Sequence, residues 1–599
     1  MLNLSRHDNT PSPTRSLKPL WFSLLAVGVG IIAGVGAVVF RWLIGLFHNL
    51  LFLGRWSIAY DANVHTPASP WGPLVILVPV VGAAGVAFLV KTFAPEAKGH
   101  GVPEVMDAIY YNRGRIRPVV AAIKSIASAL SIGSGGSVGR EGPIIQIGSS
   151  FGSTLGQWLR VPIWQRIALI AGGAGAGIAA TFNTPVGGVL FALEIMMHEV
   201  SVRTLVPVAL ATAAGTYIGR LAFGEHPSFI IPQLETPDLH ITSPVVLLAY
   251  VGLGVAAGAV SALFIKSIYA TEDFFERRVR GSYFRQHLLG MFAVGLMLYG
   301  FMATSGHYYV EGVGYSTVQE LLSGVGMPLY LLAILFGAKL LATSLTLGSG
   351  ASGGIFSPAL FLGATLGTIY GVILRFAFPQ LGISPPAFAV AGMAGVVGGS
   401  TGAAMAAIVM IFEMTLDYKV IIPMTITVAV SYGIRKVLSH ESIYTMKLAR
   451  RGHHIPEALR ANPELVRRAQ TLMMSEFGRA DASTSVAQFV STLTEDNRAP
   501  ICLVEKEGRV VGFVRSELIG NALKHSATPK LGEVANHAFI TVSPQATYLE
   551  VLGRMRASHA SLALVSSDAV PPRVDEVKGL IAREHLSHAT DESMELFLD

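Results

Sequence analysis

The sequence predicts an all-α membrane domain of many helices, followed by a small α/β domain. Three observations lead to this fold class: the uneven distribution of charge, the many apolar segments, and two similar segments within the apolar region. Of the 599 residues, 51% are hydrophobic and only 14% are charged, against about 25% charged in soluble domains. The deficit lies in the apolar, glycine-rich part of the chain. The predicted parts are an N-terminal segment (1–18), a membrane domain (19–450), a linker (451–467) and a soluble domain (468–599).

Several apolar windows are long enough to cross a bilayer, which takes about 20 residues. Examples are 21–40, 71–90, 245–264 and 286–304. Other stretches are shorter and interrupted by glycine and proline, as in 117–132, 165–180, 185–197 and 387–399. Such discontinuous helices are stable in a membrane only where their ends are buried in protein or line a wet cavity.

Basic residues flank the membrane domain on both sides. By the positive-inside rule they predict a multi-pass protein of the plasma (inner) membrane whose N- and C-termini are both cytoplasmic. The residues are Arg6, Arg15 and Lys18 before the first span, and Arg435, Lys436, Lys447, Arg450 and Arg451 at the exit.

The remaining composition excludes several classes of function. The net charge of +6 flanks membrane spans and is not set on a folded basic face, so no nucleic-acid partner is expected. The single cysteine, Cys502, excludes an intrachain disulfide and a multi-cysteine metal site. The spans contain no His/Glu metal spacing and no nucleophile motif, so we expect neither a metal site nor a catalytic residue. A cation-coupled carrier would need more acidic groups within the membrane.

An internal repeat divides the membrane domain. Residues 134–148 (SGGSVGREGPIIQIG) and 349–363 (SGASGGIFSPALFLG) share a Ser-Gly pair, a proline and a later glycine at an offset of 215 residues. Further on, 171–175 corresponds to 391–395 and 193–194 to 412–413. Broken segments at equivalent positions in two halves point to the binding site of a transporter. Parallel and inverted repeats both fit the sequence.

Pro103, Pro143 and Pro358 each follow a glycine-rich approach and are predicted to lie in the first turn of a helix. A helix start presents unpaired N–H groups and the positive end of the helix dipole. Three such starts meeting inside the bilayer would hold an anion, and weakly enough for it to leave. The alternative is tight packing through small residues, which is common in membranes.

These motifs resemble those of the CLC family of chloride channels and chloride/proton exchangers. Gly139-Arg-Glu-Gly-Pro143 and Gly354-Ile-Phe-Ser-Pro358 match two of its signatures, and Tyr444 matches its pore tyrosine. Gly99-His-Gly-Val-Pro103 matches a third signature with one departure.

The resemblance implies an inverted repeat of tilted, partly discontinuous helices and a homodimer with one pore per subunit. It implies chloride transport, with bromide or nitrate as other anions, and no required cofactor. The chloride would be held by the backbone N–H groups of Ile355 and Phe356 and the hydroxyl of Tyr444. The other predicted anion-binding residues are His100, Gly101, Arg140, Gly142 and Gly354.

The resemblance also makes Glu141 the gate, whose carboxylate occupies an anion site until protonation lets it swing away. A carboxylate deep in an apolar region is costly, which itself indicates a functional group. Neighbouring helix starts stabilise its charged form, while burial disfavours it. The alternative is a salt bridge with Arg140, but residues adjacent in sequence rarely face each other.

His100 stands where the family usually has serine. Neutral imidazole can donate one hydrogen bond to an anion, and imidazolium adds a full positive charge. Either His100 makes anion binding or gating depend on pH, or it is a neutral donor or a ring turned away from the pore. In the family this position also affects the preference between chloride and nitrate, so the resemblance leaves that preference open here.

The second departure is Ile195, which falls where exchangers of the family have a proton-relay glutamate. Isoleucine cannot carry a proton, and the neighbouring carboxylate, Glu194, is offset from this position by one residue. The sequence therefore favours a passive, gated chloride channel. The alternative is a chloride/proton antiporter whose proton path does not use a glutamate at position 195.

The soluble tail has two similar halves. Predicted strands at 499–504 and 510–514 in the first half correspond to 561–565 and 577–581 in the second. A helix precedes each pair, at 486–493 and 548–557. The alternation resembles a pair of CBS domains. Such pairs often bind adenine nucleotides, while others are structural, and the sequence leaves both open.

Overall fold

The computed structural model describes residues 16–197, 201–231, 244–279, 281–453, 455, 467–492, 500–515, 529–567 and 572–582. The chain divides into two units, Met1–His454 and Ile455–Asp599, and each is described by itself. Most of the predicted N-terminal segment and most of the predicted linker lie outside the described residues.

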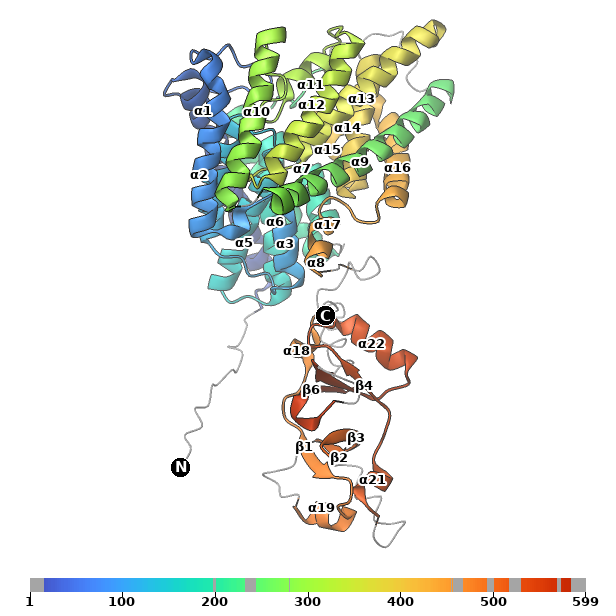
Figure 1. Ribbon diagram of the computed structural model, residues 1–599. Helices are drawn as coiled ribbons and strands as arrows, with labels where there is room; N and C mark the ends of the chain where they lie inside the picture. Colours follow the sequence, from blue (N-terminus) through green and yellow to red (C-terminus); the bar gives the residue numbers. More distant parts are fainter. Residues whose placement is uncertain are drawn as a thin grey trace. The chain divides into compact units, whose positions relative to one another are not determined.

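The first unit is a bundle of helices (Figure 1). Among the described residues, nine helices are long and apolar enough to cross a membrane, so the chain is a multi-pass membrane protein. The helices are α1 (Pro19–Leu53), α2 (Val78–Phe93), α3 (Val102–Tyr110), α4 (Val119–Gly133), α5 (Glu141–Trp158), α6 (Ile163–Phe182), α7 (Pro185–Phe191), α8 (Val202–Phe223), α9 (Pro244–Arg278), α10 (Tyr283–Ser305), α11 (Tyr315–Leu322), α12 (Leu329–Gly348), α13 (Phe356–Ala377), α14 (Pro385–Thr401), α15 (Ala404–Thr415), α16 (Ile421–Leu438) and α17 (Thr445–Arg450).

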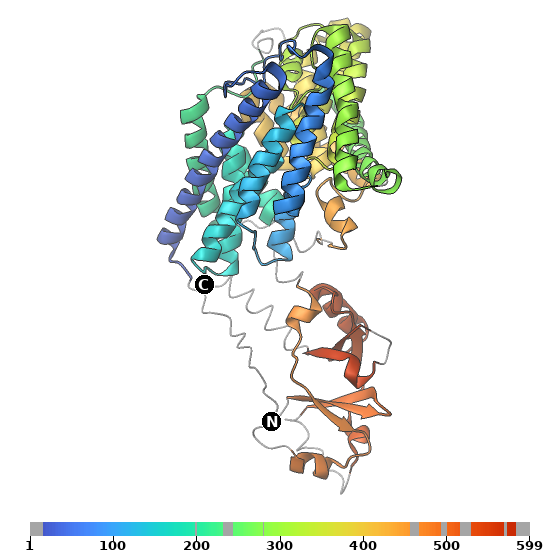
Figure 2. The same ribbon diagram turned by 60° about the vertical axis from the view of Figure 1, so that its left-hand side comes forward.

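The longest helices, α1 and α9, have 35 residues each. At 1.5 Å per residue each is about 52 Å long, well beyond the roughly 30 Å hydrocarbon core of a bilayer. Such helices must tilt, and α9 runs obliquely across the bundle in Figure 1, as the dark blue α1 does in Figure 2.

The two halves of this unit repeat one packing scheme. Helix α5 packs on α6 as α13 packs on α14, and α6 packs on α8 as α14 packs on α16. Helix α1 packs on α8 as α9 packs on α16. The sequence repeat is thus a structural repeat of α1 to α8 and α9 to α16.

A reciprocal pair of helix caps gives the direction of the repeat. Glu194, just after α7, accepts hydrogen bonds from the N–H groups of Met405 (3.3 Å) and Ala406 (2.8 Å), at the start of α15. Glu413, near the end of α15, accepts them from Val186 (3.0 Å) and Gly187 (2.7 Å), at the start of α7. Since each helix end meets the other helix start, α7 and α15 are antiparallel and the repeat is inverted.

One predicted short segment is longer than expected. Residues 165–180 belong to α6, which has 20 residues and is apolar enough to span a membrane. Its most apolar window is nevertheless 89% buried inside the protein. Small residues on every face let α1, α5, α7 and α8 all pack against it, so its glycines serve packing and do not break the helix.

The second unit contains two three-stranded sheets, ordered β1-β2-β3 and β4-β5-β6. In each sheet the first pair of strands is parallel and the second pair is antiparallel. The strands are β1 (Gly478–Asp481), β2 (Ile501–Lys506), β3 (Arg509–Arg515), β4 (Phe539–Val542), β5 (Leu562–Ser566) and β6 (Val577–Ala582), and the helices are α18 (Ala469–Leu472), α19 (Val486–Thr492), α21 (Leu531–Val534) and α22 (Tyr548–Ala557).

The two sheets share one core, in which Leu503 and Phe513 pack with Leu564 and Leu580. This duplicated arrangement is consistent with a CBS pair. Cys502 lies on β2 with 2% of its surface exposed, and burial raises the pKa of its thiol to about 12. It is a buried core residue, and its thiol is poorly reactive because it stays protonated.

Candidate functional site

Three helices, α3, α5 and α13, begin beside one another inside the membrane unit. The N–H of Gly139 donates to the carbonyl of Gly354 at 2.8 Å, and the N–H of Gly354 donates back at 2.6 Å. The N–H of Gly99 donates to the carbonyl of Ala351 at 2.9 Å. These bonds join the approaches to the three helices. The predicted prolines lie in the first turns: Pro103, Pro143 and Pro358.

The approach is so close that the site glycines leave no room for side chains. A Cβ on Gly142 would lie 2.0 Å from the carbonyl oxygen of His100, and one on Gly354 would lie 2.8 Å from the amide nitrogen of Gly142. Gly101 has a φ of 84°, in the region that glycine enters readily and L-residues rarely adopt. Gly101, Gly142 and Gly354 therefore bring the three helix starts together.

The carboxylate of Glu141, the first residue of α5, lies at the start of α13. Its Oε2 accepts a hydrogen bond from the backbone N–H of Ser357 at 3.4 Å, and its Oε1 also accepts one from the Ser357 hydroxyl. The hydroxyl of Tyr315 donates to Oε1 at 2.9 Å. Only 2% of the Glu141 surface is exposed. The carboxylate thus occupies a helix N-terminus, a position that suits an anion.

Tyr315 and Ser357 were not predicted from the sequence as partners of Glu141. Ser357 lies inside the quoted signature 354–358. Tyr315 begins α11, the counterpart of α3, and follows Gly312-Val-Gly314 as Val102 follows Gly99-His-Gly101. The internal repeat was therefore the signal that could have drawn attention to Tyr315.

His100 and Tyr444 lie together at another part of the site. Their ring centroids are 6.4 Å apart, and the ring of Tyr269 lies 6.4 Å from His100. Each of the two predicted residues is 3% exposed. Among the described residues, Nδ1 of His100 has no hydrogen-bond partner. The hydroxyl of Tyr269 donates to the carbonyl of Ile443 at 2.7 Å. This bond anchors the backbone immediately before Tyr444.

The other predicted anion-binding residues are also buried. Ile355 caps α13 and Phe356 is its first residue, with 1% and 3% of their surfaces exposed. The guanidinium of Arg140 lies 5.3 Å from the ring centroids of both Phe182 and Tyr315. The alternative of an ion pair with the adjacent Glu141 is not seen within the described region.

Ile195 is 4% exposed and lies in a π-helical segment, Ala192–Met197, that follows α7. Its neighbour Glu194 points toward α15, where it forms one of the reciprocal caps. The structure therefore places no carboxylate at position 195 and uses the adjacent one to complete a helix end.

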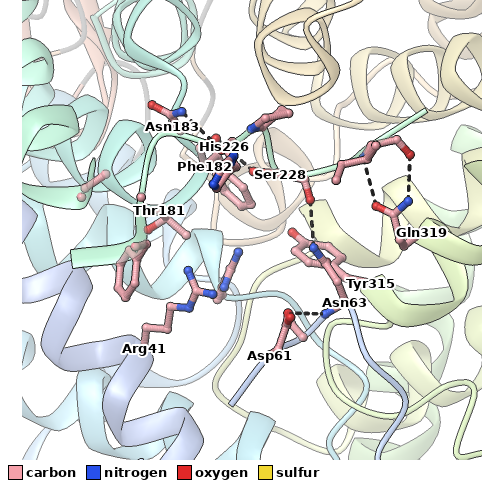
Figure 3. A pocket seen from close by; sticks show the side chains of 18 residues that line it. Arg41, Asp61, Asn63, Thr181, Phe182, Asn183, His226, Ser228, Tyr315 and Gln319 are labelled. Atoms are coloured by element: carbon pink, nitrogen blue, oxygen red, sulfur yellow. Dashed lines mark hydrogen bonds between the residues drawn. The ribbon is translucent and has the colours of Figure 1, made fainter. Parts of the chain in front are cut away.

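A cavity of about 520 Å³ is lined in part by Tyr315, the residue whose hydroxyl donates to Glu141. Arg41 and Arg140 line it, together with Asp61, Phe182 and Tyr315, and Figure 3 shows Arg41 extending from α1 toward its centre. We call it the arginine cavity. Amide side chains close its rim by bonding the backbone near residues 225–230: the Nδ2 of Asn63 donates to Ser228 O and the Nε2 of Gln319 to Ile230 O.

Comparison with known proteins places these features in context. The chain is 32% identical over 446 residues to the H(+)/Cl(-) exchange transporter ClcA of Yersinia pseudotuberculosis, covering 73% of this chain and 89% of that one. It is similar to the crystal structure of a slow cyanobacterial Cl-/H+ antiporter, with 26% identity, a TM-score of 0.62, and 73% and 99% of the two chains covered. A eukaryotic CLC transporter shares the fold over 94% of this chain and 98% of its own, with 19% identity and a TM-score of 0.59.

These comparisons overturn the preference for a passive channel. The relative and the cyanobacterial structure are named as exchangers of chloride and protons, so that prediction is wrong. It gave too much weight to Ile195. Isoleucine at position 195 leaves unchanged the Glu141 carboxylate and its hydrogen bonds at the start of α13.

The family itself follows from the length of the match. The profile described as "Voltage gated chloride channel" matches residues 82–436, more than half of the chain. That range contains the three joined helix starts and Glu141, and it runs from within α2 into α16. The chain belongs to the voltage gated chloride channel family, the CLC family.

Proposed function

We propose that this protein exchanges chloride for protons across the membrane, with Glu141 serving both ions. The observation that carries the proposal is the position of the Glu141 carboxylate, at the N-terminus of α13 with Ser357 and Tyr315 as donors. The exchange named for the ClcA relatives supports the same activity.

Coupling follows from competition for one site. The ionised carboxylate and a chloride both require the donors at the start of α13, so both cannot bind there at once. A proton on Glu141 removes its charge and weakens its hold on those donors. Chloride can then bind the donors at the start of α13 while Glu141 carries the proton. Movement of one ion is therefore tied to movement of the other.

The proton path is proposed to avoid a carboxylate at position 195. Ile195 cannot relay a proton, and the Glu194 carboxylate accepts two backbone hydrogen bonds at the start of α15. Protons would then reach Glu141 through water, which proteins order along polar surfaces.

Reconstituted liposomes test the exchange directly. Vesicles loaded with high chloride at uniform pH are diluted into low chloride, and chloride and pH electrodes record both ions. We expect outward chloride movement to drive protons inward, so the external pH rises against the developing proton gradient until a protonophore collapses it. Chloride efflux without any uphill proton movement would contradict the proposal.

His100 is proposed to act as a neutral hydrogen-bond donor to the anion. Lys124 lies beside it and donates from Nζ to the carbonyl of Gly99 at 2.7 Å. The Nζ of Lys447 is also close, 2.6 Å from where a Cβ of Gly99 would be. Two ammonium groups this near disfavour a third positive charge. The unpartnered Nδ1 remains available to a ligand.

His100→Ser separates this role from a pH-sensing one. We expect the relative permeability of nitrate and chloride to change by about tenfold, since each 1.4 kcal/mol of a lost or gained hydrogen bond has that effect. We expect the dependence of flux on pH between about 5 and 8, the imidazole range, to keep its shape. Reversal potentials in the two anions measure both. A wild-type titration in this range that disappears in the variant would show an ionising ring instead.

We propose that two copies form a homodimer with one pore each, as the resemblance implies. Both termini are proposed to lie in the cytoplasm of a cell whose inner membrane holds the protein, which the basic residues flanking the spans support. Transport is proposed to need no cofactor, and the duplicated sheets of 468–599 are where an adenine nucleotide would bind. Flux from full-length protein with and without ATP tests the last point.

A further inference from the structure

We propose that the arginine cavity is a second anion site, in which the guanidinium groups of Arg41 and Arg140 together bind a small inorganic anion. The inference rests on the proposed chloride transport and extends it by one step. The cavity site would receive the anion before it reaches the donors that Glu141 now occupies.

The charge of the cavity is the first argument. Arg41, on α1, and Arg140 repel each other, and the carboxylate of Asp61 is the acidic group that acts on Arg41 in the opposite sense. Within residues 16–453, apart from the undescribed gaps, no carboxylate forms an ion pair with either arginine. Asp61 is exposed and accepts a hydrogen bond from the N–H of Asn63 in its own loop at 2.9 Å.

The state of the Arg140 side chain is the second argument. Only 7% of its surface is exposed, yet its Nε has no hydrogen-bond partner among the described residues. Buried donors are normally satisfied, and leaving one unpaired is unfavourable. The described residues therefore leave part of the hydrogen-bonding capacity of the Arg140 guanidinium unused, in a side chain that lines the cavity.

The positions of the two side chains fit one shared ligand. Arg41 lies with Cζ 4.2 Å from the ring centroid of Phe223, and Arg140 lies between Phe182 and Tyr315. Aromatic packing leaves the edges of a guanidinium, where its N–H groups lie, free to donate. An anion between the two edges would also relieve the repulsion between the two positive charges.

The cavity is suited to capture rather than tight binding. Its volume is about 520 Å³, whereas a water molecule takes about 30 Å³ in the liquid. The cavity thus has room for a small anion together with water molecules. The anion can therefore keep part of its water. Tyr315 connects the two sites, because it lines the cavity and donates to Glu141. An anion held by Arg140 is thus already beside the gate.

Arg41→Gln tests the site, since it removes a charge without touching the gate. Flux is measured in liposomes as chloride is varied on the side to which the cavity opens. We expect the half-saturating chloride concentration to rise by about threefold to tenfold, the change expected from losing one charge-assisted contact of about 1 kcal/mol. The increase should shrink at high ionic strength, because salt screens the interaction. Arg41→Lys should recover part of the loss.

Arg55→Gln is the matched control. Arg55 follows α1 directly, is exposed and does not line the cavity, so the variant has the same net charge as Arg41→Gln. An equal shift in both variants, no shift in Arg41→Gln, or a fall in the limiting flux alone would each overturn the proposal.

Crystals soaked in bromide supply a readout that is independent of transport. We expect anomalous density between the guanidinium groups of Arg41 and Arg140 in the wild type and none there in Arg41→Gln. Wild-type density that is absent from the cavity would overturn the second site, even if proton-coupled flux is found. Density there in a protein that moves no protons would support the site and reject the exchange.

Discussion

Glu141→Gln is expected to abolish proton movement while chloride still flows. Glutamine has nearly the shape of protonated glutamate, but it cannot ionise, so it neither carries a proton nor competes as an anion for the Ser357 and Tyr315 donors. In the liposome assay we expect the proton flux to fall by more than about tenfold. Chloride flux should persist or increase, because a charged competitor has left an anion site.

Glu320→Gln is a suitable control for that experiment. Glu320 lies on α11, the helix that begins with Tyr315, but its carboxylate pairs with His65 at 3.0 Å and is 28% exposed. We expect this variant to retain proton-coupled flux. Uphill proton movement in Glu141→Gln would contradict this prediction. It would show that protons are coupled to chloride without passing through Glu141.

Gly142→Ala is expected to prevent assembly of the anion site. Its Cβ would lie 2.0 Å from the His100 carbonyl oxygen, and the atoms on both sides belong to the backbone. No side chain can rotate away, so the starts of α3 and α5 must separate. Overpacking typically costs about 1–3 kcal/mol, and more where nothing can yield. We expect chloride flux below about one-tenth of wild type and a lower melting temperature in detergent.

The control for this substitution is Gly300→Ala. Gly300 lies within α10, and a Cβ there would meet no atom within 4 Å. Alanine favours a helix over glycine by about 1 kcal/mol, so we expect unchanged or slightly higher stability. Wild-type flux and melting temperature in Gly142→Ala would show that the close approach of the two helix starts is not required.

The sequence predicted the parts of this structure that depend on local chemistry. Proline in a first turn and glycine before it mark a helix start wherever they occur, so the beginnings of α3, α5 and α13 could be located. The repeat of 134–148 in 349–363 predicted two equivalent elements, which are α5 and α13. Its inversion could not be derived from the residues, because direction is set by tertiary contacts such as those of Glu194 and Glu413.

The wrong and the missed predictions have a common cause: a sequence motif does not show which distant residues its side chains contact in the folded protein. Ile195 was taken as evidence against coupling, although the relative and the cyanobacterial structure are named as exchangers of chloride and protons. Glu194 lies one residue from the relay position in the sequence, but its carboxylate is used by a helix start more than two hundred residues later. Tyr315 carries no charge and lies in no signature; the repeat could have marked its position, but its hydrogen bond to Glu141 is visible only in the folded chain.

The reciprocal caps have a consequence for biosynthesis. When the ribosome has inserted α1 to α8, the amides that begin α7 have no acceptor, because Glu413 has yet to be translated. Unsatisfied amides are costly in lipid, so the first half must wait in an incomplete state until α15 arrives. Neither half is a finished folding unit, because each supplies a helix cap that the other half lacks.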